Sequence, residues 1–146
     1  MQIAIGSDHA GYVLKQRVKD HLISLGHELV DHGTHSSESA DYPDYAHLVA
    51  DSVESHEVDF GIVLCGSGNG VSMSVNKHQG IRAVLSWIPE IARLGRAHND
   101  ANVLALPARF ITEEVALQIV DTFFNTPFDG GRHCGRIEKI SPVPKQ

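Results

Sequence analysis

The sequence predicts an α/β domain, a Rossmann-like three-layer α/β/α sandwich around a five-stranded parallel sheet. Short apolar runs alternate with segments whose apolar residues recur at helical spacing, a pattern typical of parallel sheets covered on both faces. The segments with candidate functional residues follow the first, third and fifth strands, where such sheets bind ligands. The chain has 146 residues, so we expect a single domain over residues 1–146.

The first half of the chain contains three expected strands and two expected helices. We place the strands at 3–5, 28–31 and 60–65, with a polar loop over 32–44. The first helix has an apolar stripe at Leu14, Val18, Leu22 and Leu25, and Gly26 is placed to end the helix. The second helix has apolar residues at Ala46, Val49, Ala50 and Val53.

The second half repeats the alternation. A short helix is expected over 71–76, a strand over 81–85, a helix from Pro89 with residues 98–100 at its end, and a strand over 102–106. Thr112 is a suitable N-cap for a helix whose apolar face is Ala116, Ile119, Val120 and Phe123. One further helix is expected within 132–140.

Composition narrows the possible functions. Hydrophobic residues make up 42% of the chain, and the formal net charge of −6 argues against general binding of nucleic acid. The apolar runs are too short to span a bilayer, so no membrane association is expected. Because no basic and apolar leader opens the chain, we expect a cytoplasmic protein whose cysteines, Cys65 and Cys134, are reduced.

The segment around which the chain is organised is the apolar strand 60–65 and its glycine turn. Glycines alternate at 66, 68 and 70, and N–H groups in such a turn, at the start of a helix, can bind an anion. The spacing is neither the dinucleotide fingerprint nor a P-loop. The simpler interpretation is a tight turn between strand and helix.

Cys65 ends this strand beside the turn. There a thiolate is favoured and could act as a nucleophile or a general base. Taken alone, such a cysteine is more often a small buried apolar residue. Asp8 and His9 follow the first strand, so in a parallel sheet they should emerge at the same edge as Cys65.

The spacing of histidines and arginines indicates which of them are candidates for function. The ten histidines show no His-Glu-x-x-His motif and the cysteines no Cys-x-x-Cys pair, so no metal site is expected. His9 and His98 are candidates for function, although each alone is more often structural. Arg132 and Arg136, four residues apart, could clamp a phosphate together with Arg109, or form a solvated basic face.

Several separate motifs, in order along nearly the whole chain, resemble the family of type B ribose-5-phosphate isomerases, which also contains the galactose-6-phosphate isomerase subunits. They are Ile5-Gly-Ser-Asp-His-Ala-Gly11, Asp41-Tyr-Pro-Asp-Tyr45, Cys65-Gly-Ser-Gly-Asn-Gly70, Gly80-Ile-Arg-Ala83, His98-Asn-Asp-Ala-Asn-Val-Leu-Ala105 and Gly130-Gly-Arg-His-Cys-Gly-Arg136.

The resemblance implies an aldose-ketose isomerase that interconverts ribose 5-phosphate and ribulose 5-phosphate in pentose-phosphate metabolism, without metal or cofactor. It implies a homodimer, or a tetramer of paired dimers, with active sites between subunits. By resemblance Cys65 is the base that moves a proton between C1 and C2. The N–H groups of Gly66, Ser67, Gly68, Asn69 and Gly70 would stabilise the enediolate, with the Ser67 hydroxyl beside them.

The remaining roles are also carried over by resemblance. His98 opens the furanose ring, Asp8 and Asn99 bind sugar oxygens, and the phosphate is bound by His9, Arg109, Arg132 and Arg136. His98, Asn99 and Arg109 are expected from the partner subunit. Relatives that lack this cysteine use a glutamate on the next helix, but Asn69 and Val71 could not replace it.

Two alternatives stay open at this point. The substrate could be a six-carbon sugar phosphate, allose or galactose 6-phosphate, because one extra carbon changes binding by only ~1–3 kcal/mol. A nucleotide- or flavin-binding module could use the same sheet and turn without catalysis. That alternative gives no common role to Cys65, His98 and the arginines.

Overall fold

The protein is described here by a computed structural model over residues 1–143, and residues 144–146 of the expected domain lie outside the described residues. The chain alternates strands and helices in the order β1 (Gln2–Ser7), α1 (Tyr12–Ser24), β2 (Glu28–Asp31), α2 (Tyr42–Glu54), β3 (Phe60–Cys65), α3 (Asn69–Val75), β4 (Ala83–Leu85), α4 (Pro89–Asn99), β5 (Val103–Pro107), α5 (Glu113–Asn125) and α6 (His133–Ile137). The five strands pair in parallel in the order β2-β1-β3-β5-β4, which confirms the predicted fold class.

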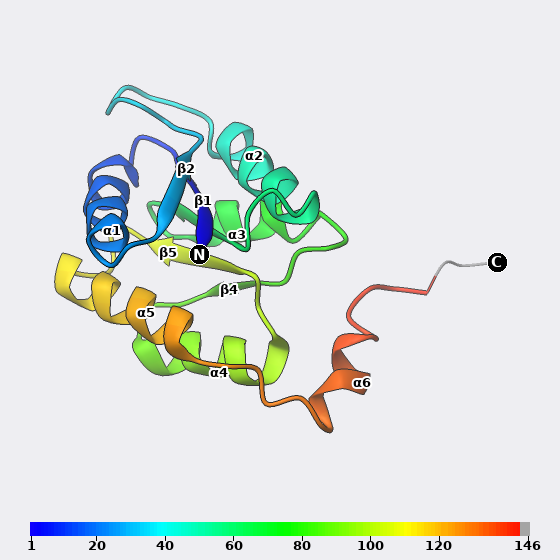
Figure 1. Ribbon diagram of the computed structural model, residues 1–146. Helices are drawn as coiled ribbons and strands as arrows, with labels where there is room; N and C mark the ends of the chain where they lie inside the picture. The colour runs from blue at the N-terminus through cyan, green and yellow to red at the C-terminus, as the bar shows by residue number, and fades with distance from the viewer. Residues whose placement is uncertain (144–146) are drawn as a thin grey trace.

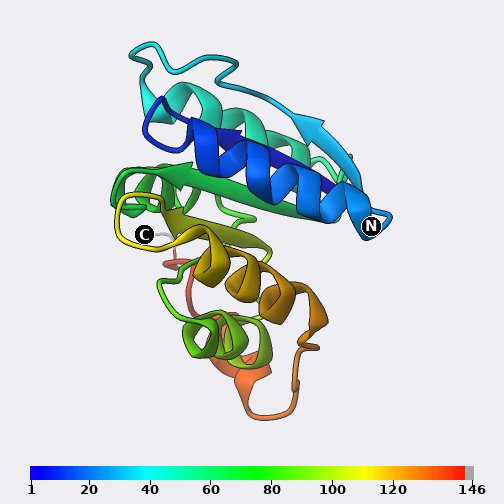
Figure 2. The same cartoon turned by 90° about the vertical axis from the view of Figure 1, so that its left-hand side faces the viewer.

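Helices cover both faces of this sheet (Figure 1). One apolar core joins the sheet to α1, α4 and α5, and a second joins it to α2 and α3. Successive residues of β3 enter alternate cores: Ile62 and Leu64 face the first, and Val63 and Cys65 the second. The side view in Figure 2 shows α1 and α5 lying across the sheet and α6 beyond α4.

The helix patterns were predicted well, with one wrong residue. Leu14, Val18 and Leu22 are buried under α1, but Leu25 is 57% exposed because α1 ends at Ser24. Gly26 follows with φ +91°, the left-handed conformation that ends a helix. Thr112 caps α5 as expected, since its Oγ1 accepts a hydrogen bond from the Val115 N–H at 3.2 Å.

Several element boundaries differ from the prediction; β1, α3 and β5 differ by one or two residues at an end, and three other differences are larger or have a visible cause. The loop after β2 ends at Asp41 because Pro43 and Asp44 occupy the first turn of α2. Strand β4 begins at Ala83, since the Ala83 N–H and C=O both bond the Asn76 side chain. The C-terminal helix is only His133–Ile137, with Arg132 at its N-cap. Among the described residues, no helix has the length and apolarity to cross a membrane.

Gly11 lets the start of α1 approach β3 directly below the predicted site. A Cβ at this position would lie 2.8 Å from the Leu64 Cβ and 3.0 Å from the Leu64 carbonyl carbon. The Gly11 N–H also donates to Asp8 Oδ1 at 3.1 Å. The same glycine therefore sets the distance between α1 and β3 and holds the Asp8 carboxylate.

Replacing Gly11 with Ala should lower the free energy of unfolding by ~1–3 kcal/mol, because the backbone of Leu64 cannot move away from the added methyl group. Urea denaturation of the Gly11→Ala variant measures the effect. Gly135→Ala is the matched control, since nothing lies within 4 Å of a Cβ there. Equal stability of the two variants would contradict this account of the packing.

Candidate functional site

The predicted residues that follow β1, β3 and β5 meet at one edge of the sheet. They border a cavity of about 490 Å³ lined by Asp8, His9, Ala10, Tyr42, Cys65, Gly66, Ser67, Gly70, Arg109 and Phe110. Strand β3 lies between β1 and β5, and Cys65 is in register with Pro107. Parallel pairing therefore brings together segments that are far apart in the sequence, as predicted.

Cys65 lies at the floor of this cavity. It is only 5% exposed, and its side chain points to the α2 and α3 side of the sheet. Its carbonyl accepts a hydrogen bond from the Ala108 N–H at 2.9 Å, so the backbone at the thiol is held by the segment after β5. Cys65 and Cys134 are both free thiols, as expected.

The glycine turn is packed too closely for side chains. Gly68 has φ +76°, and a Cβ there would collide with Leu85 and lie 3.2 Å from the Leu106 carbonyl carbon. A Cβ on Gly70 would lie 2.5 Å from the Tyr42 ring. Within the turn, Ser67 Oγ accepts a hydrogen bond from the Asn69 N–H at 3.3 Å. Ser67 and Asn69 also border an adjacent apolar cavity with Trp87 and Phe110.

Asp8 and His9 are oriented by backbone groups. Asp8 is 7% exposed, and its carboxylate accepts the Gly11 N–H. His9 Nδ1 lies 3.1 Å from the Ala40 backbone nitrogen and 3.3 Å from the Ala40 carbonyl oxygen, so the backbone of the loop before α2 fixes the orientation of the ring.

Arg109 is held at the same cavity by its own chain. Its backbone N–H donates to the Gly66 carbonyl at 2.9 Å, and its Nη1 lies 3.3 Å from where a Gly66 Cβ would be. The expectation that Arg109 reaches the site from a partner subunit is thus corrected. Because Arg109 follows β5, the neighbour of β3, it lies beside the glycine turn of its own chain.

Tyr42 is a site residue that the sequence analysis missed. Its ring lines the cavity and touches Gly70, and it begins α2 after the long loop. The tyrosine belongs to the Asp41–Tyr45 motif, which was noted without a role. A bulky residue opposite a glycine leaves no local sequence signal, because the contact joins the first turns of α2 and α3, which are far apart in the sequence.

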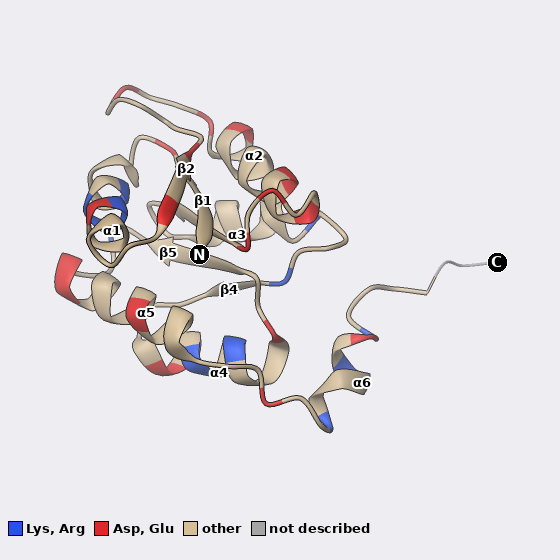
Figure 3. Ribbon diagram, in the orientation of Figure 1, with Lys and Arg blue, Asp and Glu red and all other residues tan. Residues whose placement is uncertain are grey.

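Gly68 and Asn69 do not line this cavity but belong to the turn beside it, whereas four other predicted residues lie away from this edge of the sheet. His98 and Asn99 lie in the last turn of α4, and Arg132 and Arg136 belong to the N-cap and last turn of α6. Since α4 begins after the carboxyl end of β4 and runs back, its last turn lies at the amino edge of the sheet. Figure 3 shows the basic segments of α6 beyond the end of α4, whose own basic segments lie in the middle of the helix.

His98 has its own group of neighbours at this edge. Its ring stacks on the His133 ring, with centroids 4.4 Å apart and an interplanar angle of 15°. Desolvation lowers the pKa of His133 from its usual value, and the charges of His98 and Arg132 lower it further. Asp129 lies beside both rings, and ligand atoms of His98, Asp129 and His133 lie within 4.8 Å of one another.

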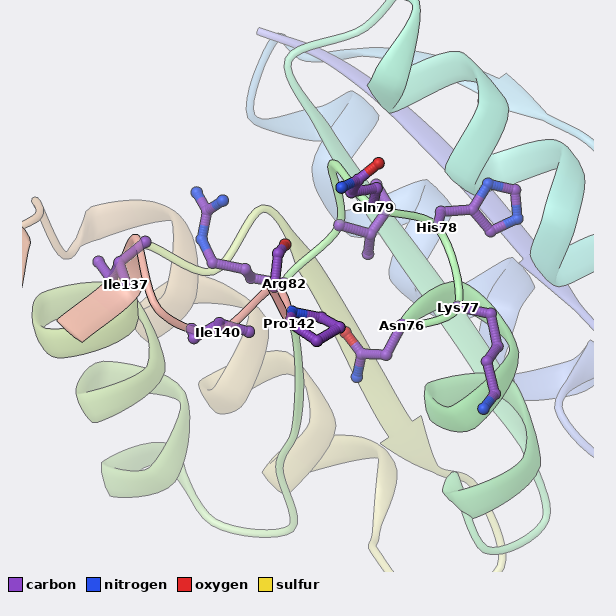
Figure 4. A pocket seen from close by; sticks show the side chains of 10 residues that line it. Asn76, Lys77, His78, Gln79, Arg82, Ile137, Ile140 and Pro142 are labelled. Carbon is purple, nitrogen blue, oxygen red and sulfur yellow. The ribbon is translucent and has the colours of Figure 1, made fainter. Parts of the chain in front are cut away.

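A second cavity, of about 340 Å³, lies between the α3–β4 connection and the C-terminal segment (Figure 4). His78, Arg82, Ile137 and Ile140 are among the residues that line it. The Arg82 guanidinium is engaged in hydrogen bonds to the backbone. Its Nε donates to the Asn99 carbonyl at 3.0 Å and its Nη2 to the Asp100 carbonyl at 2.9 Å. None of the predicted site residues lines this cavity, so we assign the site to the carboxyl edge.

Relatives of known sequence match the chain over almost its whole length. Ribose-5-phosphate isomerase B of Escherichia coli (strain K12) is 46% identical over 145 residues, which are 99% of this chain and 97% of that protein. A probable ribose-5-phosphate isomerase B of Mycoplasma genitalium is 43% identical over 146 residues, covering 99% of this chain and 96% of that protein.

Solved structures agree with these matches. A ribose 5-phosphate isomerase from Thermotoga maritima superposes with a TM-score of 0.95 at 57% identity, covering 97% of this chain and 98% of that one. The Mycoplasma genitalium ribose-5-phosphate isomerase B with bound ribulose-5-phosphate superposes with a TM-score of 0.91 at 44% identity, covering 95% of this chain and 93% of that one.

The resemblance noted in the motifs is confirmed by these comparisons. The profile of the family described as ribose/galactose isomerase matches residues 3–140, which include every residue of the cavity around Cys65. This chain belongs to the ribose/galactose isomerase family.

Proposed function

We propose that the protein interconverts D-ribose 5-phosphate and D-ribulose 5-phosphate through an enediolate intermediate. The observation that carries the proposal is the placement of Cys65 in one cavity with Asp8, Ser67 and Arg109, in a chain related to enzymes named for this reaction. A relative that is 44% identical holds ribulose-5-phosphate. The family also contains galactose isomerases, so a six-carbon sugar phosphate remains the second candidate substrate.

The chemistry follows from the groups around the cavity. The Cys65 thiolate removes the C2 proton of the open-chain aldose, and the electron pair moves onto the carbonyl oxygen to give the enediolate. The O2 hydroxyl proton passes to O1, the thiol returns its proton to C1, and the C2 carbonyl of the ketose forms. Donors of the glycine turn and the Ser67 hydroxyl stabilise the developing negative charge, a contribution of ~3–4 kcal/mol per well-placed donor. Asp8 binds sugar hydroxyls beside them.

The phosphate group requires cations that one chain supplies only in part. Arg109 and His9 border the cavity around Cys65, whereas Arg132 and Arg136 lie on α6 at the other edge. His98, which we propose opens the furanose ring, lies there too. We infer that a second copy of the chain supplies four residues to the cavity: His98, Asn99, Arg132 and Arg136. The enzyme is then at least a homodimer.

An exposed apolar surface beside the cavity supports this assembly. Trp87 is 52% exposed and Phe110 75%, and both line the small cavity next to Ser67. Met73 on α3 is 67% exposed. Large apolar side chains gathered beside a site are typical of a protein interface. The cytoplasmic location expected from the sequence stays a prediction.

The first test measures the rate at which the protein forms ribulose 5-phosphate from ribose 5-phosphate in the presence of a chelator. We expect kcat/KM above ~10⁴ M⁻¹ s⁻¹, and values lower by about tenfold or more for allose and galactose 6-phosphates. Turnover of a hexose phosphate alone would keep the chemistry and change the substrate. No turnover of any sugar phosphate would favour a binding module without catalysis.

Cys65→Ala should lower kcat by ~10²–10⁴-fold, because the variant lacks the thiol that we propose as the general base. Exchange of the C2 proton with deuterated solvent, followed by NMR, reports the step directly. Binding of ribose 5-phosphate to the variant, measured by calorimetry, should change little. Cys134→Ala is the control and should keep full activity; an active Cys65→Ala variant would remove Cys65 from the mechanism.

Mixing two inactive variants tests the shared site. Cys65→Ala and His98→Asn homodimers should each be nearly inactive, while unfolding and refolding them together should restore roughly a quarter of wild-type activity. About half of the dimers are then mixed, and each mixed dimer has one site with both native residues. Absence of any recovery, with mixed dimers demonstrated by mass spectrometry, would place Cys65 and His98 in the same chain's site.

A further inference from the structure

Three potential metal ligands meet at the end of α4, outside the cavity around Cys65. His98 comes from the last turn of α4, Asp129 from the segment between α5 and α6, and His133 from α6. One ligand atom from each lies within 4.8 Å of the other two. Among residues 1–143, this is the group of His, Cys, Asp and Glu side chains that comes together closely enough to hold an ion.

The backbone holds these residues in place. The Asp129 N–H donates to the Ala97 carbonyl at 2.9 Å, which ties the segment after α5 to the last turn of α4. Gly130 and Gly131 then take φ +66° and +58°, so the chain reverses and brings His133 back onto α4. His133 is 9% exposed and stacks on His98, whereas Asp129 is exposed.

The ligand set favours a borderline divalent cation over Mg²⁺ or Ca²⁺. Two imidazoles and one carboxylate form a common zinc set that leaves a coordination position for water, whereas Mg²⁺ and Ca²⁺ prefer oxygen ligands. Tetrahedral coordination at bonds of ~2.0 Å needs ligand atoms ~3.3 Å apart. The rings must therefore turn out of their stack, and the exposed Asp129 side chain must move toward them.

Charges nearby oppose a cation but are partly compensated. Arg132 and Arg136 lie on the same segment as His133, and Arg93 lies five residues before His98 on α4. Arg93 is neutralised by Glu90, which accepts hydrogen bonds from it at 2.6 and 2.9 Å. The site should consequently bind zinc reversibly rather than hold it permanently.

We propose that His98, Asp129 and His133 form a Zn²⁺ site that inhibits the enzyme. A zinc ion bound to the His98 imidazole occupies the nitrogen lone pair that a proton-transfer role requires. The ion also pulls the His98 ring away from its free position against His133. The inhibition rests on the proposed role of His98, whereas zinc binding itself does not.

Competition with a chromogenic zinc chelator measures binding in the full chain. We expect one Zn²⁺ per chain and no competition by Mg²⁺. Asp129→Asn and His133→Gln should each weaken zinc binding by about tenfold or more, since each removes one of three ligands. His47→Gln is the matched control: His47 Nδ1 lies 2.7 Å from His78 Nε2, an imidazole pair elsewhere on the surface, and the variant should bind zinc as the wild type does.

Activity is then measured in the same zinc titration. Ribose 5-phosphate turnover should fall as the site fills, recover with chelator, and resist zinc in the Asp129→Asn variant, whose circular dichroism should match the wild type. Wild-type zinc binding in that folded variant, or none in the wild type, would overturn the site. Zinc binding that depends on Asp129 but leaves turnover unchanged would keep the site and refute both the inhibition and the ring-opening role of His98.

Discussion

The parallel pairing of β3 with β1 on one side and β5 on the other is the constraint on which the site depends. Because the strands point the same way, the residues after each of them emerge at one edge. Asp8, Cys65 and Arg109 are brought together in this way without any local sequence relation. The side chains of Ile62 and Leu64 secure β3 in one core and Val63 in the other, so Cys65 rests on a rigid support.

The second requirement of the site is that two positions of the turn after β3, Gly68 and Gly70, carry no side chain. At Gly70 the Tyr42 ring occupies the space of a Cβ, and at Gly68 the backbone of Leu106 and the Leu85 side chain do so. The turn is therefore compressed between α2 on one side and β4 and β5 on the other. We infer that its N–H groups are fixed by packing before any substrate arrives, which is the condition for efficient stabilisation of an oxyanion.

Residue patterns predicted most of the fold because each strand and helix carries its own periodicity. Leu25 was misplaced, since the stripe continues in sequence beyond the residue where α1 ends. Of the site, the residues next to strand ends were predictable from topology. Tyr42 and the approach of Asp129 to His98 were not, because both depend on how segments far apart in the sequence pack together. The position of Arg109 within its own chain became clear only from the sheet order.

The direction of α4 is the reason why we propose a site built from two chains. A helix that connects two parallel strands must run opposite to them, so a residue in its last turn lies at the amino edge, a sheet length from Cys65. No rotation of the His98 side chain can cover that distance. If His98 acts on the sugar held above Cys65, it does so from a second copy, and a zinc ion at Asp129 and His133 would then control the site of the neighbouring subunit rather than that of its own chain.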